Sequence, residues 1–263
     1  MEIPSTLCSN VYDFAFCPEP CYDRLVDLAD PEDWGPGNRI LKNYLSFSFS
    51  RAVFLTERDL DQTGPSNLPL VFDDDRCLFN TGLYTRRYET IYGLFEPNTK
   101  PDARQRWFLK GFFKESDPML VSFEYLPCRV RFAEDPSELV FDYRLPIRSN
   151  IDHILGDEEN LTRIPASLMG GGTTRCCCAA LLRAPSSKPP RRAAANYTLA
   201  VPQFYGGRIQ LLLPLCLTGD KPELALTIQR EDGFYAARTC LTLDMAYNNA
   251  RLICRPETSW IKR

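Results

Sequence analysis

Histidine is almost absent from this chain of 263 residues, in which His153 is the only one. Cysteine is not scarce, but its eleven copies are an odd number and include no Cys-x-x-Cys pair. A zinc site needs such a pair together with a second pair of cysteines or histidines, so the sequence does not indicate one. We expect reduced thiols instead, most of them buried as small hydrophobic side chains.

Long apolar runs are also missing. No stretch approaches the roughly 18 consecutive apolar residues of a membrane-spanning helix. Residues 1–10 lack the basic start and the apolar run of a signal peptide. The sequence therefore predicts an intracellular protein, cytoplasmic or nuclear, with no membrane partner.

Acidic residues are missing from one long window, residues 160–219, which contains neither Asp nor Glu. The window holds seven basic residues, namely Arg163, Arg175, Arg183, Lys188, Arg191, Arg192 and Arg208. Because the net charge of the chain is −3, the remaining residues carry −10. This segregation indicates either one positive face for an anion or a solvated basic loop. The triple glycine Gly170–Gly172 lacks the Gly-Lys-Ser/Thr end of a phosphate-binding loop.

Apolar residues make up 44% of the sequence and aromatic residues 12%, enough for a substantial core. Between residues 71 and 147 they fall in short runs typical of strands. These runs are Cys77–Leu83, Glu89–Phe95, Trp107–Phe113, Met119–Phe123 and Leu139–Tyr143. No helical crossover separates them, which favours antiparallel pairing. The predicted fold is α+β, a single domain of mainly antiparallel β-sheet with a few short helices.

Two segments fit two structures each. Residues 38–56 begin with helical spacing, but residues 46–50 alternate Phe and Ser. A helix running into a strand is expected there, with one continuous helix as the alternative. Residues 245–253 fit a hairpin that turns at Asn248-Asn249, or a helix, and we favour the hairpin.

Residues 1–38 are rich in Pro, Asp and Cys and are predicted to be an irregular segment with a short helix near Cys21–Ala29. Residues 39–263 are predicted to form the α+β domain. Within it, Pro, Arg and Ala dominate residues 184–195, which we expect to be a mobile basic loop. Hairpin turns are expected at residues 206–207 and 232–233, which read Gly-Gly and Asp-Gly.

Several motifs together resemble one protein family. They are Phe79–Leu83, Lys110–Asp117, Asn150–Leu155, Ala200–Tyr205, Ile209–Leu217 and Leu241–Ile253. From about Leu28 to Trp260, the chain resembles a "domain of unknown function" family of bacteria and fungi. Some members of that family are joined to OST-HTH (LOTUS) RNA-binding modules and to NYN-type nuclease domains. The resemblance implies an RNA context and no particular reaction.

One segment departs from the family pattern. The family usually has a compact basic helix before the pair Asn196-Tyr197, whereas this chain has the proline-broken, alanine-rich residues 183–195. The departure either weakens a basic face or marks an error in the gene model.

His153 is the first candidate catalytic residue, because histidine is the side chain that titrates near neutral pH without perturbation. As a general acid or base it would be oriented by Asp152 or Asp244, and Arg251 would stabilise charge. The alternative is a histidine at a helix start, bonded to a backbone carbonyl. Asp152 with Asp244 is only a weak indication of a Mg²⁺ site, so no metal is predicted, and the sequence does not identify a cofactor.

The candidate ligand-binding residues are polar or aromatic groups within or beside apolar runs. They are Asn80, Lys110, Lys114, Tyr197, Gln203, Tyr205, Gln210, Tyr247, Asn248 and Asn249. The lysines would contact phosphate, the glutamines a base edge, and Tyr205 would stack on a base. The structural alternatives are a turn at Asn80, solvated edge lysines, and a satisfied buried network around the glutamines.

Three functions are compatible with these patterns. The first is an RNA- or nucleotide-binding module, the second an enzyme acting on RNA ends or nucleotides with His153 as acid/base, and the third a protein-interaction scaffold. A pocket that joins His153 to an acid and an arginine would favour the enzyme. An exposed face with aromatic side chains would favour binding. Buried, mutually bonded amides would favour the scaffold.

Overall fold

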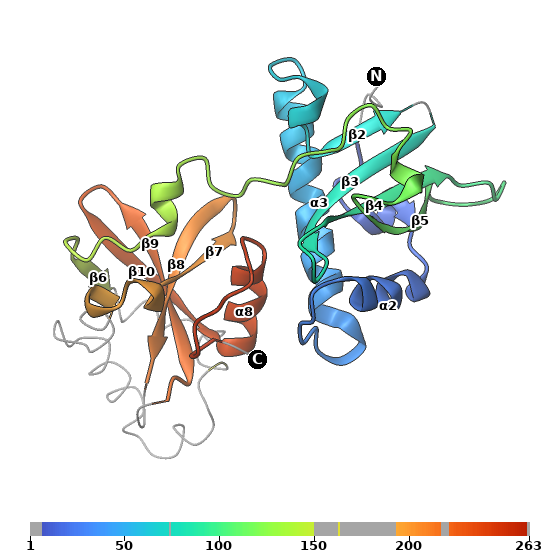
Figure 1. Cartoon of the computed structure of the whole chain (residues 1–263). Coiled ribbons are helices and arrows are strands. Elements are labelled where there is room, and N and C mark those ends of the chain that lie inside the picture. The colour runs from blue at the N-terminus through green and yellow to red at the C-terminus, as the bar shows by residue number, and fades with distance from the viewer. Residues whose placement is uncertain (1–6, 74, 150–162, 164–192, 217–220, 262–263) are drawn as a thin grey trace. The chain divides into compact units, whose positions relative to one another are not determined.

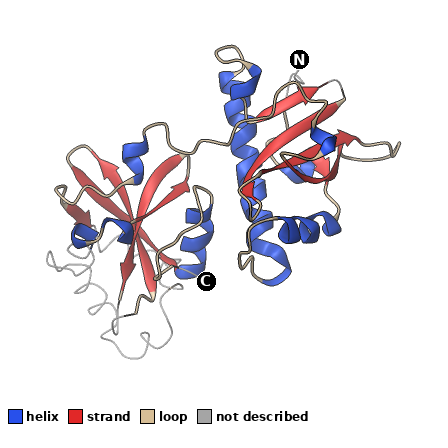
Figure 2. Ribbon diagram, in the orientation of Figure 1, coloured by secondary structure: helices blue, strands red, loops and turns tan. Residues whose placement is uncertain are grey.

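The computed structural model describes residues 7–73, 75–149, 163, 193–216 and 221–261. They form two compact units, an N-terminal unit within Met1–Arg131 and a C-terminal unit within Phe132–Arg263 (Figure 1). Each unit contains one five-stranded sheet and helices, so the predicted α+β class is confirmed (Figure 2). None of the helices in the described ranges has the length and apolar character needed to cross a bilayer.

The sheet of the N-terminal unit has the strand order β1-β5-β4-β3-β2. Its strands are β1 (Ala15–Phe16), β2 (Leu70–Asp73), β3 (Arg76–Tyr84), β4 (Thr90–Pro97) and β5 (Trp107–Lys114). The short β1–β5 pair is parallel, and the other pairs of this sheet are antiparallel. The first three strands predicted between residues 71 and 147 are therefore confirmed as β3, β4 and β5.

Residues 1–38 are more regular than their composition indicates. They contain α1 (Val11–Phe14), β1 and α2 (Glu19–Leu28), and α2 matches the short helix expected there. Asn10 begins α1 by accepting a hydrogen bond from the backbone of Tyr12, and α2 begins directly after Pro18. A side-chain cap therefore begins α1, whereas α2 follows a proline and has no side-chain cap.

Helix α3 (Arg39–Asp59) is continuous, so the expected change from helix to strand is wrong and its alternative is correct. Its buried positions recur every three or four residues and include Leu41, Leu45, Ser48, Ala52, Leu55 and Asp59. Ser48 faces the core while the phenylalanine before it is exposed, so the alternation of Phe and Ser does not separate two faces of a strand. α3 packs against the sheet, where the Phe49 ring lies 5.4 Å from that of Phe79.

Two predicted strands, Met119–Phe123 and Leu139–Tyr143, are wrong. The 3₁₀ turns Pro118–Leu120 and Pro136–Leu139 occupy or precede them. In both turns an aspartate before the proline accepts a hydrogen bond from the backbone N–H two residues on, which begins the turn. Three apolar residues in these two runs are buried, which is why the runs resemble strands. They are Leu120, Phe123 and Phe141.

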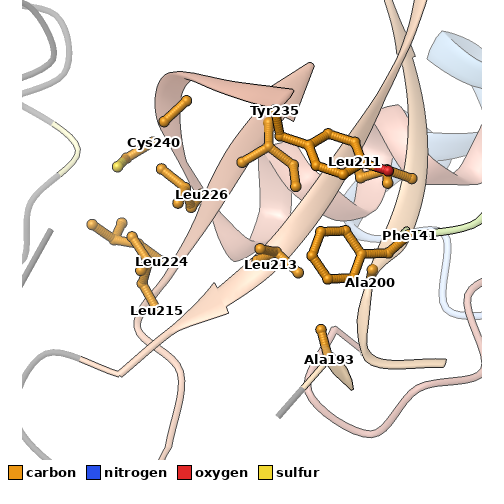
Figure 3. Packing of buried hydrophobic residues seen from close by; sticks show 12 residues of the cluster. Phe141, Ala193, Ala200, Leu211, Leu213, Leu215, Leu224, Leu226, Tyr235 and Cys240 are labelled. Atoms are coloured by element: carbon orange, nitrogen blue, oxygen red, sulfur yellow. The ribbon is translucent and has the colours of Figure 1, made fainter. Parts of the chain in front are cut away.

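The sheet of the C-terminal unit has the strand order β6-β10-β9-β8-β7. Its strands are β6 (Ile147–Ser149), β7 (Val201–Tyr205), β8 (Arg208–Leu215), β9 (Leu224–Glu231) and β10 (Phe234–Thr242). The expected turns at residues 206–207 and 232–233 join antiparallel neighbours. One face of this sheet carries an apolar core, whose side chains Figure 3 shows; Leu211, Leu213, Tyr235 and Phe141 belong to it.

Residues 245–253 lie mostly in a helix, so the expected hairpin is wrong. Helix α8 (Leu243–Arg251) follows β10 directly. Thr242 Oγ1 accepts a hydrogen bond from Met245 N at 3.3 Å, and Asp244 lies in the first turn, where the helix dipole favours a carboxylate. The cap and the buried stripe of the helix outweigh the turn preference of the two asparagines.

Asp142 predicts a pH dependence of stability. Arg144 Nε and Nη2 each donate to a carboxylate oxygen of Asp142 at 2.8 Å, and these bonds hold the pKa of Asp142 at about 2, below its ordinary 3.8. Because the folded pKa is the lower one, the stabilisation is complete above the ordinary pKa and is lost as the pH falls toward 2. We expect Asp142→Asn to lower the free energy of unfolding at neutral pH, with the difference shrinking toward pH 2 in urea unfolding. Arg144→Ala should behave alike, whereas a loss independent of pH would contradict this account.

Candidate functional site

Three glutamines lie in a row across neighbouring strands of the C-terminal unit. Gln203 of β7 is directly opposite Gln210 of β8, and the β8–β9 register places Gln229 next in the row. Leu211 belongs to the core of Figure 3, so its neighbour Gln210 points to the opposite face of the sheet. Helix α8 lies on that face, because its Asn249 bonds to Gln203.

The amides form a chain of hydrogen bonds that runs in one direction. Asn249 Nδ2 donates to Gln203 Oε1 at 3.1 Å, and Gln203 Nε2 donates to Gln210 Oε1 at 2.8 Å. Gln210 Nε2 donates to Gln229 Oε1 at 3.3 Å. Gln229 Nε2 in turn donates to Glu231 Oε1 at 3.2 Å. We call these five side chains the amide chain.

The amide chain ends on a charge, since Arg238 of β10 donates to the same Glu231 oxygen. The glutamines are buried, with Gln203 only 1% exposed. Each carbonyl oxygen and each amide nitrogen of the three already has one partner within the chain, and their burial leaves little surface for reading a base edge. The geometry favours the structural alternative for Gln203, Gln210 and Asn249, a satisfied buried network.

Sequence reasoning missed the outer half of this network. Gln229, Glu231 and Arg238 are absent from the predicted site. A signal was present, because Thr227, Gln229 and Glu231 recur with the period of two that places them on one face of β9. What the pattern alone does not show is the register that aligns this face with Gln203 and Gln210.

The remaining candidates on α8 are spread along the helix. Asp244 is exposed in the first turn and Arg251 is buried in the last, about 10 Å away along the helix axis. Asn248 Nδ2 donates to the backbone oxygen of Asp244 at 3.0 Å, and Tyr247 is buried. His153 and Asp152 lie outside the described residues, so the predicted catalytic set stays a prediction.

Asn80 and Thr81 lie at an irregularity of β3, and both side chains are hydrogen-bonded there. Asn80 Nδ2 donates to Pro127 O at 2.9 Å, and Asn80 Oδ1 accepts from Gly82 N at 2.9 Å. Thr81 Oγ1 donates to Ile91 O at 2.6 Å. Both side chains are buried, and the strand register shifts just after Asn80. These contacts favour the turn-like, structural alternative for Asn80.

Both candidate lysines are ion-paired at the edge of the N-terminal sheet. Lys110 Nζ lies 3.2 Å from Glu96 Oε2, and Lys114 Nζ lies 3.1 Å from Glu89 Oε1. Hydrogen bonds from Ser116 and Lys114 hold the pKa of Glu89 below its ordinary value. Among the described strands, none lies beyond most of β5, so charged side chains also protect an edge there. This pairing favours the edge-lysine alternative over a phosphate contact.

The end of the β7–β8 hairpin carries an exposed tyrosine and an exposed arginine. Tyr205 is 64% exposed and lies directly opposite Arg208. Gly206 and Gly207 between them have φ angles of 58° and 78°, as a tight two-residue turn requires. Cross-strand partners place their β-carbons about 5 Å apart, so the ring and the guanidinium share one small surface. In the described ranges neither side chain makes a hydrogen bond or an ion pair.

Arg163 and Arg208 are the two described members of the basic window at residues 160–219. Arg163 Nη1 donates to Thr239 Oγ1 at 3.2 Å and to Cys240 O at 3.1 Å, so it binds β10. Tyr197 is 75% exposed, in a 3₁₀ turn at the other end of β7 from the hairpin turn. The basic loop expected at residues 184–195 lies largely outside the described residues.

Several described cysteines serve as small hydrophobic side chains, as expected. Cys21, Cys77 and Cys240 are buried. Burial raises the pKa of the Cys77 thiol well above its ordinary value, which opposes thiolate chemistry there. Within the described ranges, no three side chains of the His, Cys, Asp and Glu types gather as a metal site.

Comparison with known proteins places the chain in a family. No curated protein and no solved structure shows a significant match to it. A family model described as "Domain of unknown function (DUF3825)" matches residues 25–260, which is most of the chain and spans both units. The chain therefore belongs to the DUF3825 family.

Proposed function

We propose that this protein is a module that binds single-stranded RNA, with the β7–β8 hairpin tip as a contact point. The observation that carries the proposal is the pairing of Tyr205 with Arg208 at an exposed turn, where neither side chain is engaged by the described residues. An RNA context is also what the family resemblance implies. The cytoplasmic or nuclear location expected from the sequence belongs to the same proposal.

The chemistry of the tip suits an unpaired nucleotide. A base can stack on the exposed Tyr205 ring, while the Arg208 guanidinium donates to the adjacent phosphate. No atom of the described residues, apart from the chain neighbours, would stand within 4 Å of a β-carbon on Gly206 or Gly207, so this part of the structure leaves room for a ligand to approach the turn. Stacking on one tyrosine tolerates any base, and the proposal is therefore one of weakly sequence-selective binding.

The amide chain has a different part in this proposal. Its buried members stabilise the hairpin two residues inward from the tip, through the Gln203–Gln210 pair. They stabilise the folded hairpin and do not contact the base. The mutual bonding of the amides also favours a second candidate function, the protein-interaction scaffold, in which the whole polar row is architectural.

Retention of short, mixed-sequence single-stranded RNA on a filter, at a series of salt concentrations, tests the proposal. We expect Tyr205→Ala to weaken binding roughly tenfold, since one stacked base contributes about 1–3 kcal/mol. Arg208→Ala should reduce the slope of log K against log salt by about 0.7, the value for one lost phosphate contact.

Tyr143→Ala is the matched control, because Tyr143 is a similarly exposed tyrosine of the same unit. It should leave the affinity unchanged. Absence of salt-sensitive retention by the unaltered chain would rule out RNA binding and leave the scaffold.

A further inference from the structure

The turn between β3 and β4 presents three exposed side chains in succession, Arg86, Arg87 and Tyr88. Tyr88 is 85% exposed, the most of any large hydrophobic side chain in the described ranges. Neither guanidinium has a hydrogen bond or an ion pair to another described residue. Other arginines of the unit are engaged, such as Arg131, which donates to Asp59 at 2.8 Å. The turn therefore gathers two uncompensated positive charges and an aromatic ring.

The backbone of this turn is fixed before any ligand arrives. Thr85 N donates to Glu89 O at 2.9 Å, and Tyr88 N donates to Thr85 O at 2.9 Å. Thr85 Oγ1 accepts further bonds from Arg87 N and Glu89 N, at 3.3 and 3.2 Å. An isolated bridge to Ala29 joins the base of the turn to the end of α2. A ligand would therefore order side chains only, which lowers the entropic cost of binding.

The conformation of Tyr88 is itself unusual. Its φ angle is 62°, and only Asn38 shares a positive φ among the non-glycine residues described. This conformation is unfavourable for an ordinary residue and persists only where surrounding bonds impose it. Here the bonds to Thr85 impose it and turn the ring outward into solvent.

Glu89, the acidic residue that follows Tyr88 in the chain, does not neutralise the turn. Glu89 accepts from Lys114 Nζ at 3.1 Å and from Ser116 N at 3.3 Å, on the β5 side. These bonds hold its pKa below the ordinary value, so it stays ionised and paired with Lys114. The positive charge of the two arginines is left for an external anion.

We propose that the Arg86–Tyr88 turn is a second contact for single-stranded RNA, in the unit that the first contact does not include. The two guanidiniums would donate to successive phosphates, and an unpaired base would stack on Tyr88. The inference rests on the proposed function, because it assigns a further surface to the same ligand. A second RNA contact accounts for the outward Tyr88 ring beside two arginines without ion pairs to described residues. A turn with only a structural role does not require this arrangement.

The test compares two double variants that remove the same charge from the same unit. Arg86→Ala with Arg87→Ala removes the proposed contacts, and Arg104→Ala with Arg106→Ala removes two other exposed arginines. With a fluorescent mixed-sequence single-stranded RNA, the first variant should reduce the salt slope by about 1.4, the value for two phosphates. The control pair should change the slope little.

Tyr88→Ala separates stacking from charge. We expect it to weaken RNA binding roughly tenfold with an unchanged salt slope, and Tyr88→Phe to keep the affinity of the unaltered chain. Equal slopes for the two double variants, in a chain that still binds RNA through Tyr205, would overturn this inference alone. Failure of the unaltered chain to bind RNA would overturn it together with the proposed function. Binding of a phosphotyrosine peptide that depends on Arg86 and Arg87, without RNA binding, would reassign the turn to a protein partner.

Discussion

Replacement of Gly82 by alanine should lower the free energy of unfolding of the N-terminal unit by about 2–4 kcal/mol. Gly82 has a φ of 69°, where a β-carbon alone costs about 1–2 kcal/mol. That carbon would also lie 2.6 Å from the Tyr44 hydroxyl. The hydroxyl donates to Thr81 O at 2.8 Å in a buried position, so moving it away sacrifices a hydrogen bond of about 1 kcal/mol.

Three further variants separate these causes in urea unfolding followed by circular dichroism. Gly206→Ala has a similar φ but open space around the new carbon, so it should cost only the ~1–2 kcal/mol of the backbone conformation. Gly64→Ala has an ordinary φ of −68° and open space, so it should change stability by less than about 1 kcal/mol. In a Tyr44→Phe background the contact with the hydroxyl is gone, and Gly82→Ala should then cost no more than Gly206→Ala. An undiminished cost there would show that the hydroxyl is not the cause.

The strands could be predicted from the sequence wherever a turn with a strong chemical preference bounded them. The Gly-Gly pair at residues 206–207 and the Asp-Gly pair at 232–233 fix two hairpins of the C-terminal sheet. The errors arise where two patterns compete. Phe and Ser alternate in residues 46–50, yet Ser48 lies on the stripe that faces the core of a helix. The Asn pair at residues 248–249 suits a turn, yet Thr242 begins a helix that runs through it.

The candidate site was predictable in part, because amides within apolar runs must find partners. Gln203 and Gln210 were identified on that ground, but their partners depend on strand register, which composition does not show. The Arg86–Tyr88 turn was missed for the opposite reason. Its residues are exposed and polar, as in an ordinary loop, and only the bonds of Thr85 reveal that they are held in one arrangement.

Replacement of Gln210 by leucine should destabilise the C-terminal unit by about 2–4 kcal/mol. Leucine has nearly the volume of glutamine, so the variant opens no large cavity. It leaves Gln203 Nε2 without its acceptor and Gln229 Oε1 without its donor. A buried polar group that loses its partner costs about 1–3 kcal/mol, and both of these groups lie on a face covered by α8. Gln62→Leu, at an exposed position, is the matched control and should be close to neutral.

A double-mutant cycle tests whether the amides act as one unit. In the Gln210→Leu background, Gln203 Nε2 has already lost its acceptor. Gln203→Leu should therefore cost at least about 1 kcal/mol less in that background than it does alone. Additive losses in urea unfolding would mean that the two glutamines are stabilised independently, and the amide chain would not be a cooperative element.

The same variant distinguishes stabilisation of the hairpin from base recognition. If the amides hold the hairpin and Tyr205 with Arg208 contact the ligand, Gln210→Leu should lower the unfolding midpoint yet leave RNA affinity unchanged well below it. Tyr205→Ala should do the reverse, because the ring is exposed and contributes little to folding. Loss of RNA affinity in folded Gln210→Leu would instead assign base reading to the amides.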